Sequence, residues 1–170
     1  RISNSDGTSV GSGESLSVYA NSHGFFGRDR STQHSIGCAL IAGQGDDMQR
    51  DGWYSTALAR DELEAPVAIG RHAAERTLAR MAPRTLATGE YPVLFAAEVA
   101  RSLVGHLLGA VSGGALYRRA SFLLDHAGKQ VFPDWFAIDE QPLLLRGLRS
   151  AAFDGEGVAT RESPLVRAGV

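Results

Sequence analysis

The chain has 170 residues, with 17 lysines and arginines against 19 aspartates and glutamates, for a formal net charge of −2. This near-neutral balance, without a basic cluster, argues against a nucleic-acid-binding module, because phosphate neutralisation supplies most of such affinity. The longest apolar window, residues 99–116, is interrupted by Arg101 and His106 and is no membrane span. A hydrophobic content of 44% argues against disorder along the whole chain.

Cys38 is the only cysteine, so neither an internal disulfide nor a multi-cysteine zinc site can form. This cysteine usage fits a reducing compartment, and we expect a cytoplasmic location. The first residue is Arg1, not an initiator methionine. We therefore expect a segment of a longer protein and leave the question of N-terminal targeting open.

The first 57 residues predict antiparallel strands. Residues 1–30 are rich in Ser, Gly and Asn and predict short strands separated by turns at 6–7, 11–13 and 23–24. Between residues 31 and 42, apolar side chains recur at every second position, and a turn-rich stretch at 43–47 leads to Trp53 and Tyr54. We expect a hairpin here.

A helix is expected over residues 66–82, because Pro66 suits a first helical turn and acidic residues precede it. Its predicted buried stripe steps by three or four and consists of Val67, Gly70, Ala74, Leu78 and Met81. Pro83 ends the helix. Residues 83–90 are expected to form a linker between a domain at 1–82 and a second domain at 91–170.

A short apolar strand is expected at residues 91–97, followed by a second helix over 98–111. This helix is apolar on most of its faces, which indicates a buried helix, and His106 is interpreted as a hydrogen-bonded core histidine. Ser-Gly-Gly at 112–114 ends it, and residues 143–149 are compatible with one or two further helical turns. The predicted fold class is α+β, a mainly antiparallel sheet with two principal helices.

Common catalytic patterns do not explain the polar residues. No two of the five histidines have the spacing of a zinc-hydrolase helix. His34 and Cys38 would lie about 13 Å apart along one strand, so they predict no dyad, and Cys38 is interpreted as a small buried hydrophobe. The Asp-Gly-Glu-Gly run at 154–157 is interpreted as a solvated turn in preference to a cation site. From these residues alone, the function is undetermined.

Four stretches of the sequence resemble the TldD/PmbA family, and specifically its PmbA branch, also called TldE. The first is FGRDRSTQHSIGC at residues 26–38, and the most specific is GHLLGAVSGGALYRRASFL at 105–123. GKQVFPDW at 128–135 and FDGEGVATR at 153–161 follow in the same order. The resemblance implies an internal segment of a larger multidomain fold, from the end of its central domain to the start of its C-terminal domain.

The family resemblance implies a two-subunit zinc metalloprotease. Its TldD subunit carries an H-E-x-x-x-H helix that holds the catalytic zinc, and its PmbA subunit is a related partner without metal. The complex is associated with trimming microcin-type peptide precursors and with degrading antitoxin or unfolded polypeptides, and the label modulator of DNA gyrase arose through such substrates. The implied partners are therefore a TldD-like subunit and a peptide or unfolded polypeptide, and a homodimer is an alternative assembly.

Aligning the zinc helix of the family with residues 101–106 places Arg101 at the first His, Ser102 at the Glu and His106 at the second His. Arginine has no lone pair to give a metal, and serine cannot replace a carboxylate that activates water. We therefore predict no catalytic residue and no metal in this chain, with zinc held by the TldD-like partner. Contacts with substrate or partner are predicted, by resemblance, for Ser112, Gly113, Gly114, Arg118 and Arg119.

Two functional hypotheses remain. The first is a non-catalytic interaction subunit of a heteromeric metallopeptidase, whose glycine-flanked strands pair with extended substrate backbone. The alternative is an independent homomeric metallopeptidase or hydrolase that uses His106 with ligands outside this segment. Arg101 argues against the alternative, because it puts a permanent cation where a metal ligand is needed.

Overall fold

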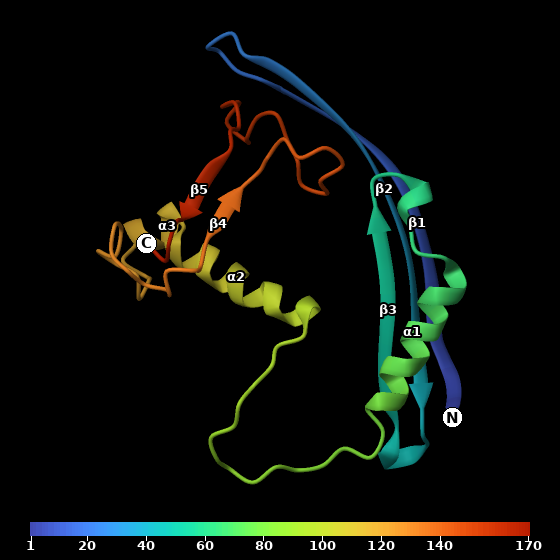
Figure 1. The fold of residues 1–170 in the computed structure, drawn as a ribbon. Coiled ribbons are helices and arrows are strands. Elements are labelled where there is room, and N and C mark those ends of the chain that lie inside the picture. Colours follow the sequence, from blue (N-terminus) through green and yellow to red (C-terminus); the bar gives the residue numbers. More distant parts are fainter. The chain divides into compact units, whose positions relative to one another are not determined.

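The computed structural model describes residues 1–170, which form two compact units (Figure 1). Unit 1 contains residues 1–85 and 140–163, and unit 2 contains residues 86–139 and 164–170. The α+β class predicted from the sequence is confirmed. The elements in chain order are β1 (Ile2–Ala20), β2 (Phe26–Ala42), β3 (Gln49–Ala57), α1 (Pro66–Ala79), α2 (Ala97–Val111), α3 (Gly113–Tyr117), β4 (Ile138–Glu140) and β5 (Ser163–Val166), with 3-10 turns at Gly45–Asp47 and Arg60–Glu62.

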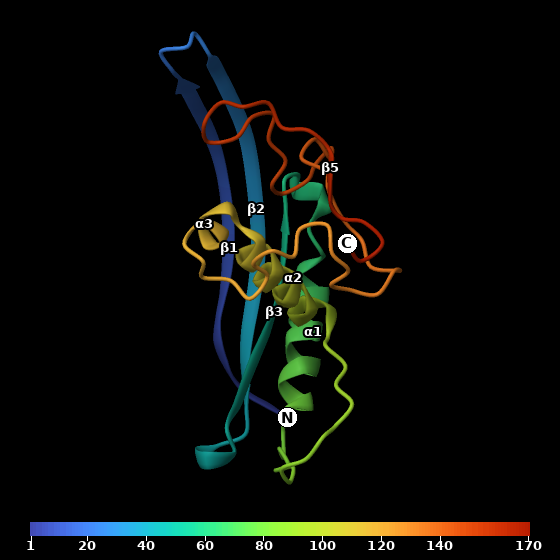
Figure 2. The same cartoon turned by 90° about the vertical axis from the view of Figure 1, so that its left-hand side faces the viewer.

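Unit 1 is built on a three-stranded antiparallel sheet in the order β1-β2-β3 (Figure 2). The hairpin predicted between the second and third strands is confirmed, and so is the turn at residues 23–24. The turns expected at 6–7 and 11–13 are wrong, because β1 runs through both as one strand with irregular pairing only near Asn4 and Gly7. Gly7 has φ 121° at this irregularity. A Cβ atom at Gly11 would lie 2.8 Å from Ser35 Oγ, so that glycine permits close strand pairing.

Helix α1 packs on β2 and β3 through Ile69, Ala73 and Thr77, which are almost completely buried. The predicted stripe is therefore wrong: Val67 is 75% exposed, and the buried row lies on a neighbouring face. The polar threonine at the C-terminal end of that row obscured it in the sequence. The Thr77 hydroxyl donates to the carbonyl of Ala73 at 2.7 Å, so this buried hydroxyl is hydrogen-bonded within its own helix.

A polar cluster also fixes α1 against β3. The indole N–H of Trp53 donates to the carboxylate of Glu64, 3.1 and 3.2 Å from its two oxygens. His72 Nδ1 lies 3.6 Å from Glu64 Oε2, and the guanidinium of Arg76 lies 5.4 Å from the centre of the Trp53 ring. The cluster joins the start of the helix to the sheet, which is a structural role.

Residues 140–163 return to unit 1. The ring of Phe153 contacts that of Phe25 with centroids 5.3 Å apart, and a Cβ atom at Gly27 would lie 2.7 Å from Phe153. The solvated turn predicted at 154–157 is confirmed, because Asp154 Oδ1 accepts the N–H groups of Glu156 and Val158, each at 2.9 Å. These bonds lower the pKa of Asp154 below its ordinary value of 3.8.

Unit 2 contains α2, α3 and most of the paired strands β4 and β5, whose residues Glu140 and Ser163 belong to unit 1. The strand predicted at 91–97 is wrong: residues 91–96 have no regular structure, and Ala97 begins α2. Residues 143–149, in unit 1, form turns and no helix. The expected buried helix is also wrong, since α2 has no buried residue. The apolar pattern of the sequence indicates which faces of α2 favour contact with other apolar groups. In this structure no other segment fully covers those faces.

Neither α1, with 14 residues, nor α2, with 15, has the length that a bilayer-spanning helix requires, and no other helix has it either.

Candidate partner and peptide interface

The three residues aligned with the zinc helix lie on the open side of α2, and all three are exposed. Ser102 and His106 are four residues apart and share a face, whereas Arg101 and His106 are about 140° apart around the helix axis. The hydroxyl of Ser102 donates to the carbonyl of Val99 at 2.7 Å. Because His106 is exposed, the interpretation of a buried core histidine is wrong.

These side chains do not fit a zinc ion. Arg101 is a cation, the Ser102 hydroxyl is engaged with its own helix, and the His106 imidazole is the one good donor among the three. No group of three His, Cys, Asp or Glu side chains lies close enough to hold a metal ion anywhere in residues 1–170. A histidine alone is no catalytic zinc centre.

The surface of α2 is apolar as well as open. Gly105 and Gly109 face space in which an added Cβ would meet no atom within 4 Å. Four large side chains on the other faces of the helix are between 37% and 51% exposed, namely Val99, Leu103, Val104 and Leu108. An apolar surface of this extent on a helix is typical of a protein interface.

Ser112 connects α2 to α3 and caps both helices. Its hydroxyl donates to the carbonyl of Gly109 at 2.9 Å and accepts the N–H of Ala115 at 3.4 Å. Gly113 and Gly114 follow without positive φ. A Cβ at Gly113 would meet no atom within 4 Å, and one at Gly114 would meet only the flexible Arg118 guanidinium, at 3.3 Å.

Arg118 and Arg119 end α3 in a Schellman motif. The N–H of Arg119 donates to the carbonyl of Leu116 at 3.0 Å, and the N–H of Ala120 donates to that of Ala115 at 2.9 Å. Arg119 has φ 54°, the left-handed conformation that usually belongs to glycine at this position. The motif thus exposes two neighbouring guanidinium groups next to the open end of α2.

The structure therefore brings the predicted contact residues together on one stretch of chain. All five predicted contact residues are exposed. They lie in or next to the short helix α3 and are Ser112, Gly113, Gly114, Arg118 and Arg119. Arg101, Ser102 and His106 lie on the helix that precedes it. This surface has an accessible backbone at Gly113, the two guanidinium groups of Arg118 and Arg119, and exposed apolar side chains on α2. It has no nucleophilic side chain hydrogen-bonded to a base.

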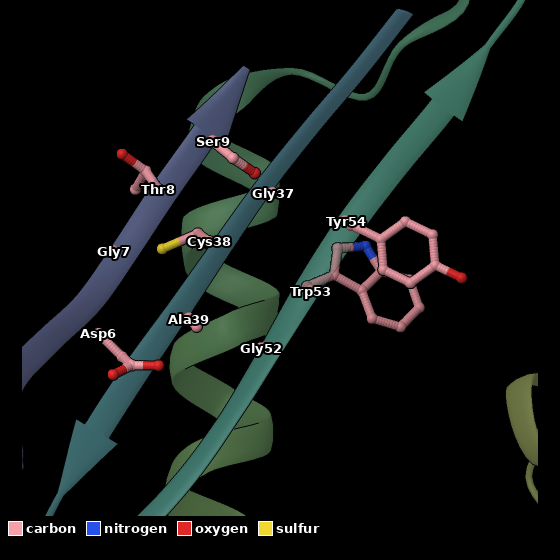
Figure 3. Close-up of a pocket in the computed structure, with 10 residues that line it drawn as sticks. All are labelled: Asp6, Gly7, Thr8, Ser9, Gly37, Cys38, Ala39, Gly52, Trp53 and Tyr54. Atoms are coloured by element: carbon pink, nitrogen blue, oxygen red, sulfur yellow. The ribbon is translucent and has the colours of Figure 1, made fainter. Parts of the chain in front are cut away.

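The structure contains two surface hollows that the sequence did not predict. The first, about 370 Å³, lies in unit 2 on another side of α2 and is lined mainly by aliphatic side chains, including Leu107 and Val111, with Lys129 and His126 among its polar residues. The second, about 430 Å³, is an open depression on the sheet face opposite α1 (Figure 3). Gly37, Ala39 and Gly52 contribute to it. Small residues at every second position of β2, namely Ser35, Gly37 and Ala39, are the signal in the sequence that marks this second surface.

Comparison with known proteins gives the family. The PmbA/TldA metallopeptidase central domain matches residues 1–81, and the PmbA/TldA metallopeptidase C-terminal domain matches residues 88–170. The chain belongs to the TldD/PmbA family. This confirms the resemblance found in the sequence motifs.

Relatives in the family match along the whole chain. Metalloprotease PmbA of Escherichia coli O157:H7 is 45% identical over 170 residues, and its homologue from Haemophilus influenzae is 44% identical over the same length. The chain spans 38% of the length of each of these relatives.

Solved structures share the fold. A putative modulator of DNA gyrase from Bacteroides thetaiotaomicron superimposes with a TM-score of 0.87 at 27% identity, over 95% of this chain and 37% of that one. A second such protein, from Thermotoga maritima, gives a TM-score of 0.80 at 27% identity, over 90% of this chain and 35% of that one.

Proposed function

We propose that this chain belongs to the non-catalytic, PmbA-type subunit of a two-subunit zinc metallopeptidase. In this proposal, a TldD-like subunit holds the zinc and cleaves the peptide. The present chain contributes binding surface for the TldD-like subunit and for an extended peptide or unfolded polypeptide. Microcin-type precursors and antitoxins are the proposed substrates, and the cytoplasm is the proposed location.

One observation carries this proposal: α2 keeps His106 but has Arg101 and Ser102 where the zinc helix of the family needs a histidine and a glutamate. A guanidinium is a permanent cation and would repel a metal ion at this position. The partly exposed apolar side chains of α2 further support a role in contact, because exposed apolar surface gains stability from being covered.

The exposed end of α3 supports peptide contact. Arg118 and Arg119 can bind carboxylates of a peptide or of a partner subunit, although an exposed ion pair contributes only about 0–1 kcal/mol. Gly113 leaves room for a neighbouring backbone, because no atom lies within 4 Å of its Cβ position.

Co-expression with a TldD-like subunit tests the proposal. We expect the two proteins to co-purify and the mixture to cleave an unstructured peptide, whereas the present protein alone leaves that peptide intact. Peptide cleavage by this protein alone, sensitive to a zinc chelator and lost in a His106→Ala variant, would favour the independent enzyme instead.

A further inference from the structure

Two of the sequence motifs that carry the family resemblance lie far apart in the chain but meet in unit 1. The motif at residues 26–38 begins at the closed end of the β1–β2 hairpin. The motif at 153–161 lies in the segment between the end of β4 and the start of β5, residues 141–162, which we call the strap. The hairpin falls in the central domain of the family and the strap falls in its C-terminal domain.

Three aromatic rings join the strap to the hairpin. The ring of Phe25, in the hairpin turn, has its centroid 6.0 Å from that of Tyr19 on β1 and 5.3 Å from that of Phe153 on the strap. All three side chains are half-buried. The rings of Phe25 and Phe153 meet edge to face, an arrangement that stabilises an aromatic pair beyond the area it buries. The cluster therefore holds the strap against the closed end of the hairpin.

Two glycines, one on each segment, make this close packing possible. A Cβ atom at Gly27 of the hairpin would lie 2.7 Å from the ring of Phe153. One at Gly157 of the strap would lie 2.7 Å from the ring of Phe25 and 2.8 Å from that of Tyr19. Gly157 also has φ 82°, which a residue with a side chain rarely adopts. Each segment thus provides a glycine against which an aromatic ring of the other packs.

Two turns of the same design hold the rings in place. Asn21 Oδ1 in the hairpin accepts the N–H groups of the second and fourth residues after it, at 3.0 and 3.2 Å. Asp154 Oδ1 in the strap accepts the N–H groups at the same two positions, each at 2.9 Å. The fourth residue of the first turn is Phe25. Phe153 directly precedes the second turn, which its bridge to Ala159 closes.

The strap contacts a part of the hairpin that β3 does not reach. β3 pairs with residues 34–42 of β2, whereas the hairpin continues to the pair formed by Ala20 and Phe26. A hairpin of two strands is only marginally stable unless one of its faces packs on another segment. The aromatic cluster supplies such packing at the closed end.

The strap has a second attachment to unit 1. The guanidinium of Arg146 donates to the carboxylate of Glu62, in the 3-10 turn that precedes α1. At its base the strap is continuous with β4 and β5, which pair with each other. It is therefore a closed loop of the C-terminal domain of the family, with its far end packed on the central domain.

We propose that the strap is a latch that keeps the closed end of the β1–β2 hairpin ordered. When the strap lifts, residues 15–31 become mobile and the three-stranded part of the sheet stays formed. The conformation of this end of the central domain is then set by the C-terminal domain. This inference is independent of the proposed function, which depends on α2 and α3, so failure of one leaves the other standing.

Hydrogen–deuterium exchange of the complete protein tests the latch. In a Phe153→Ala variant we expect the amides of residues 15–18 and 28–31 to exchange about tenfold faster, because the aromatic contact that opposes local opening is lost. Residues 36–42, which pair with strands on both sides, should exchange at the wild-type rate. Leu145→Ala, on the same strap and 87% exposed in the wild type, is the control and should change neither region.

A matched pair of glycine variants keeps the test decisive if Phe153→Ala destabilises the whole protein. Gly157→Ala puts a methyl group against the rings of Phe25 and Tyr19 and should accelerate exchange of the hairpin end. Gly155→Ala, two residues earlier, has no positive φ and meets no atom within 4 Å, so it should not. Unchanged exchange of the hairpin end in Gly157→Ala, equal effects of the two glycine variants, or an equal rise at residues 36–42 in Gly157→Ala would overturn the proposal.

Discussion

The N–H of Arg119 donates to the carbonyl oxygen of Leu116 at 3.0 Å while the Arg119 backbone holds φ at 54°. A helix end of this type usually places glycine at the left-handed residue, because a Cβ atom is disfavoured there. Strained residues of this kind cluster at functional sites. The strain lies next to the surface proposed to contact a peptide or partner.

Arg119→Gly should stabilise the protein by about 0.5–1 kcal/mol, because relief of the left-handed strain exceeds the entropy that glycine adds to the unfolded chain. Urea unfolding followed by circular dichroism measures this change. Arg118→Gly is the matched control, since Arg118 has φ −77° and nothing to relieve, and it should not stabilise. Equal effects of the two substitutions would show that the conformation of Arg119 carries no strain.

The carboxylate of Asp154 makes the free energy of unfolding depend on pH. Its pKa is lowered by the N–H groups of Val158 and Glu156, so the ionised form is favoured in the folded state. This contribution is fully present above the ordinary pKa of 3.8 and is lost as the pH falls through the lower folded value. The carboxyl resonance of Asp154 in an NMR titration should have its midpoint below 3.8.

The Asp154→Asn variant keeps an oxygen that accepts the same bonds but carries no charge. We expect it to be less stable than the wild type near neutral pH, and the difference should shrink as the pH falls below 3.8. A difference that grows on acidification would mean that the carboxylate is not the stabilised form.

The sequence predicted the two long helices because their ends carry local chemistry. Pro66 is the first residue of α1, as expected, and the Ser-Gly-Gly run ends α2 at Val111, as expected. The end of α1 lies three residues before the predicted 82, because Arg80 and Met81 already form a closing turn through the carbonyls of Thr77 and Leu78. Prolines, caps and turns act locally and are visible in the sequence.

Features that depend on distant contacts were not predictable. The continuity of β1 depends on pairing with β2, which turns the glycines of residues 7–13 from turn signals into strand residues. The apolar run at 91–96 reads as a strand, but no strand pairs with it. The positions of the candidate site came from the family motifs, whereas the left-handed Arg119 and the short helix α3 required the structure.

Restoring the family residues on α2 should not create a peptidase. The double variant Arg101→His and Ser102→Glu places a second histidine ligand and a water-activating carboxylate near His106, but it supplies neither the third zinc ligand nor the groups that orient the donors. Loss of orienting groups alone lowers metal affinity or activity about 10–100-fold. Peptide cleavage measured with added zinc and without a TldD-like subunit should stay at background. Recovered zinc-dependent cleavage would show that the chain already contains the remaining ligand.

Gly113→Val should weaken assembly with a TldD-like subunit, or cleavage by the complex, more than Arg118→Ala does. A Cβ atom at Gly113 meets no atom of its own chain within 4 Å, so the added side chain is expected to obstruct a neighbouring chain, whereas Arg118 is an exposed charge of small energetic weight. Thermal unfolding of each variant separates the two explanations: a lower melting temperature with normal assembly would assign Gly113 to the start of α3 alone. A folded Gly113→Val variant with normal assembly and cleavage would contradict the proposed contact.

The central claim is that this chain serves a metallopeptidase without holding its zinc. Metal analysis of the purified protein, alone and after co-purification with a TldD-like subunit, tests it most directly. The account predicts background zinc in the protein alone, and about one zinc per heteromer that persists in a His106→Ala variant. Stoichiometric zinc in the protein alone, lost on His106→Ala, would contradict it.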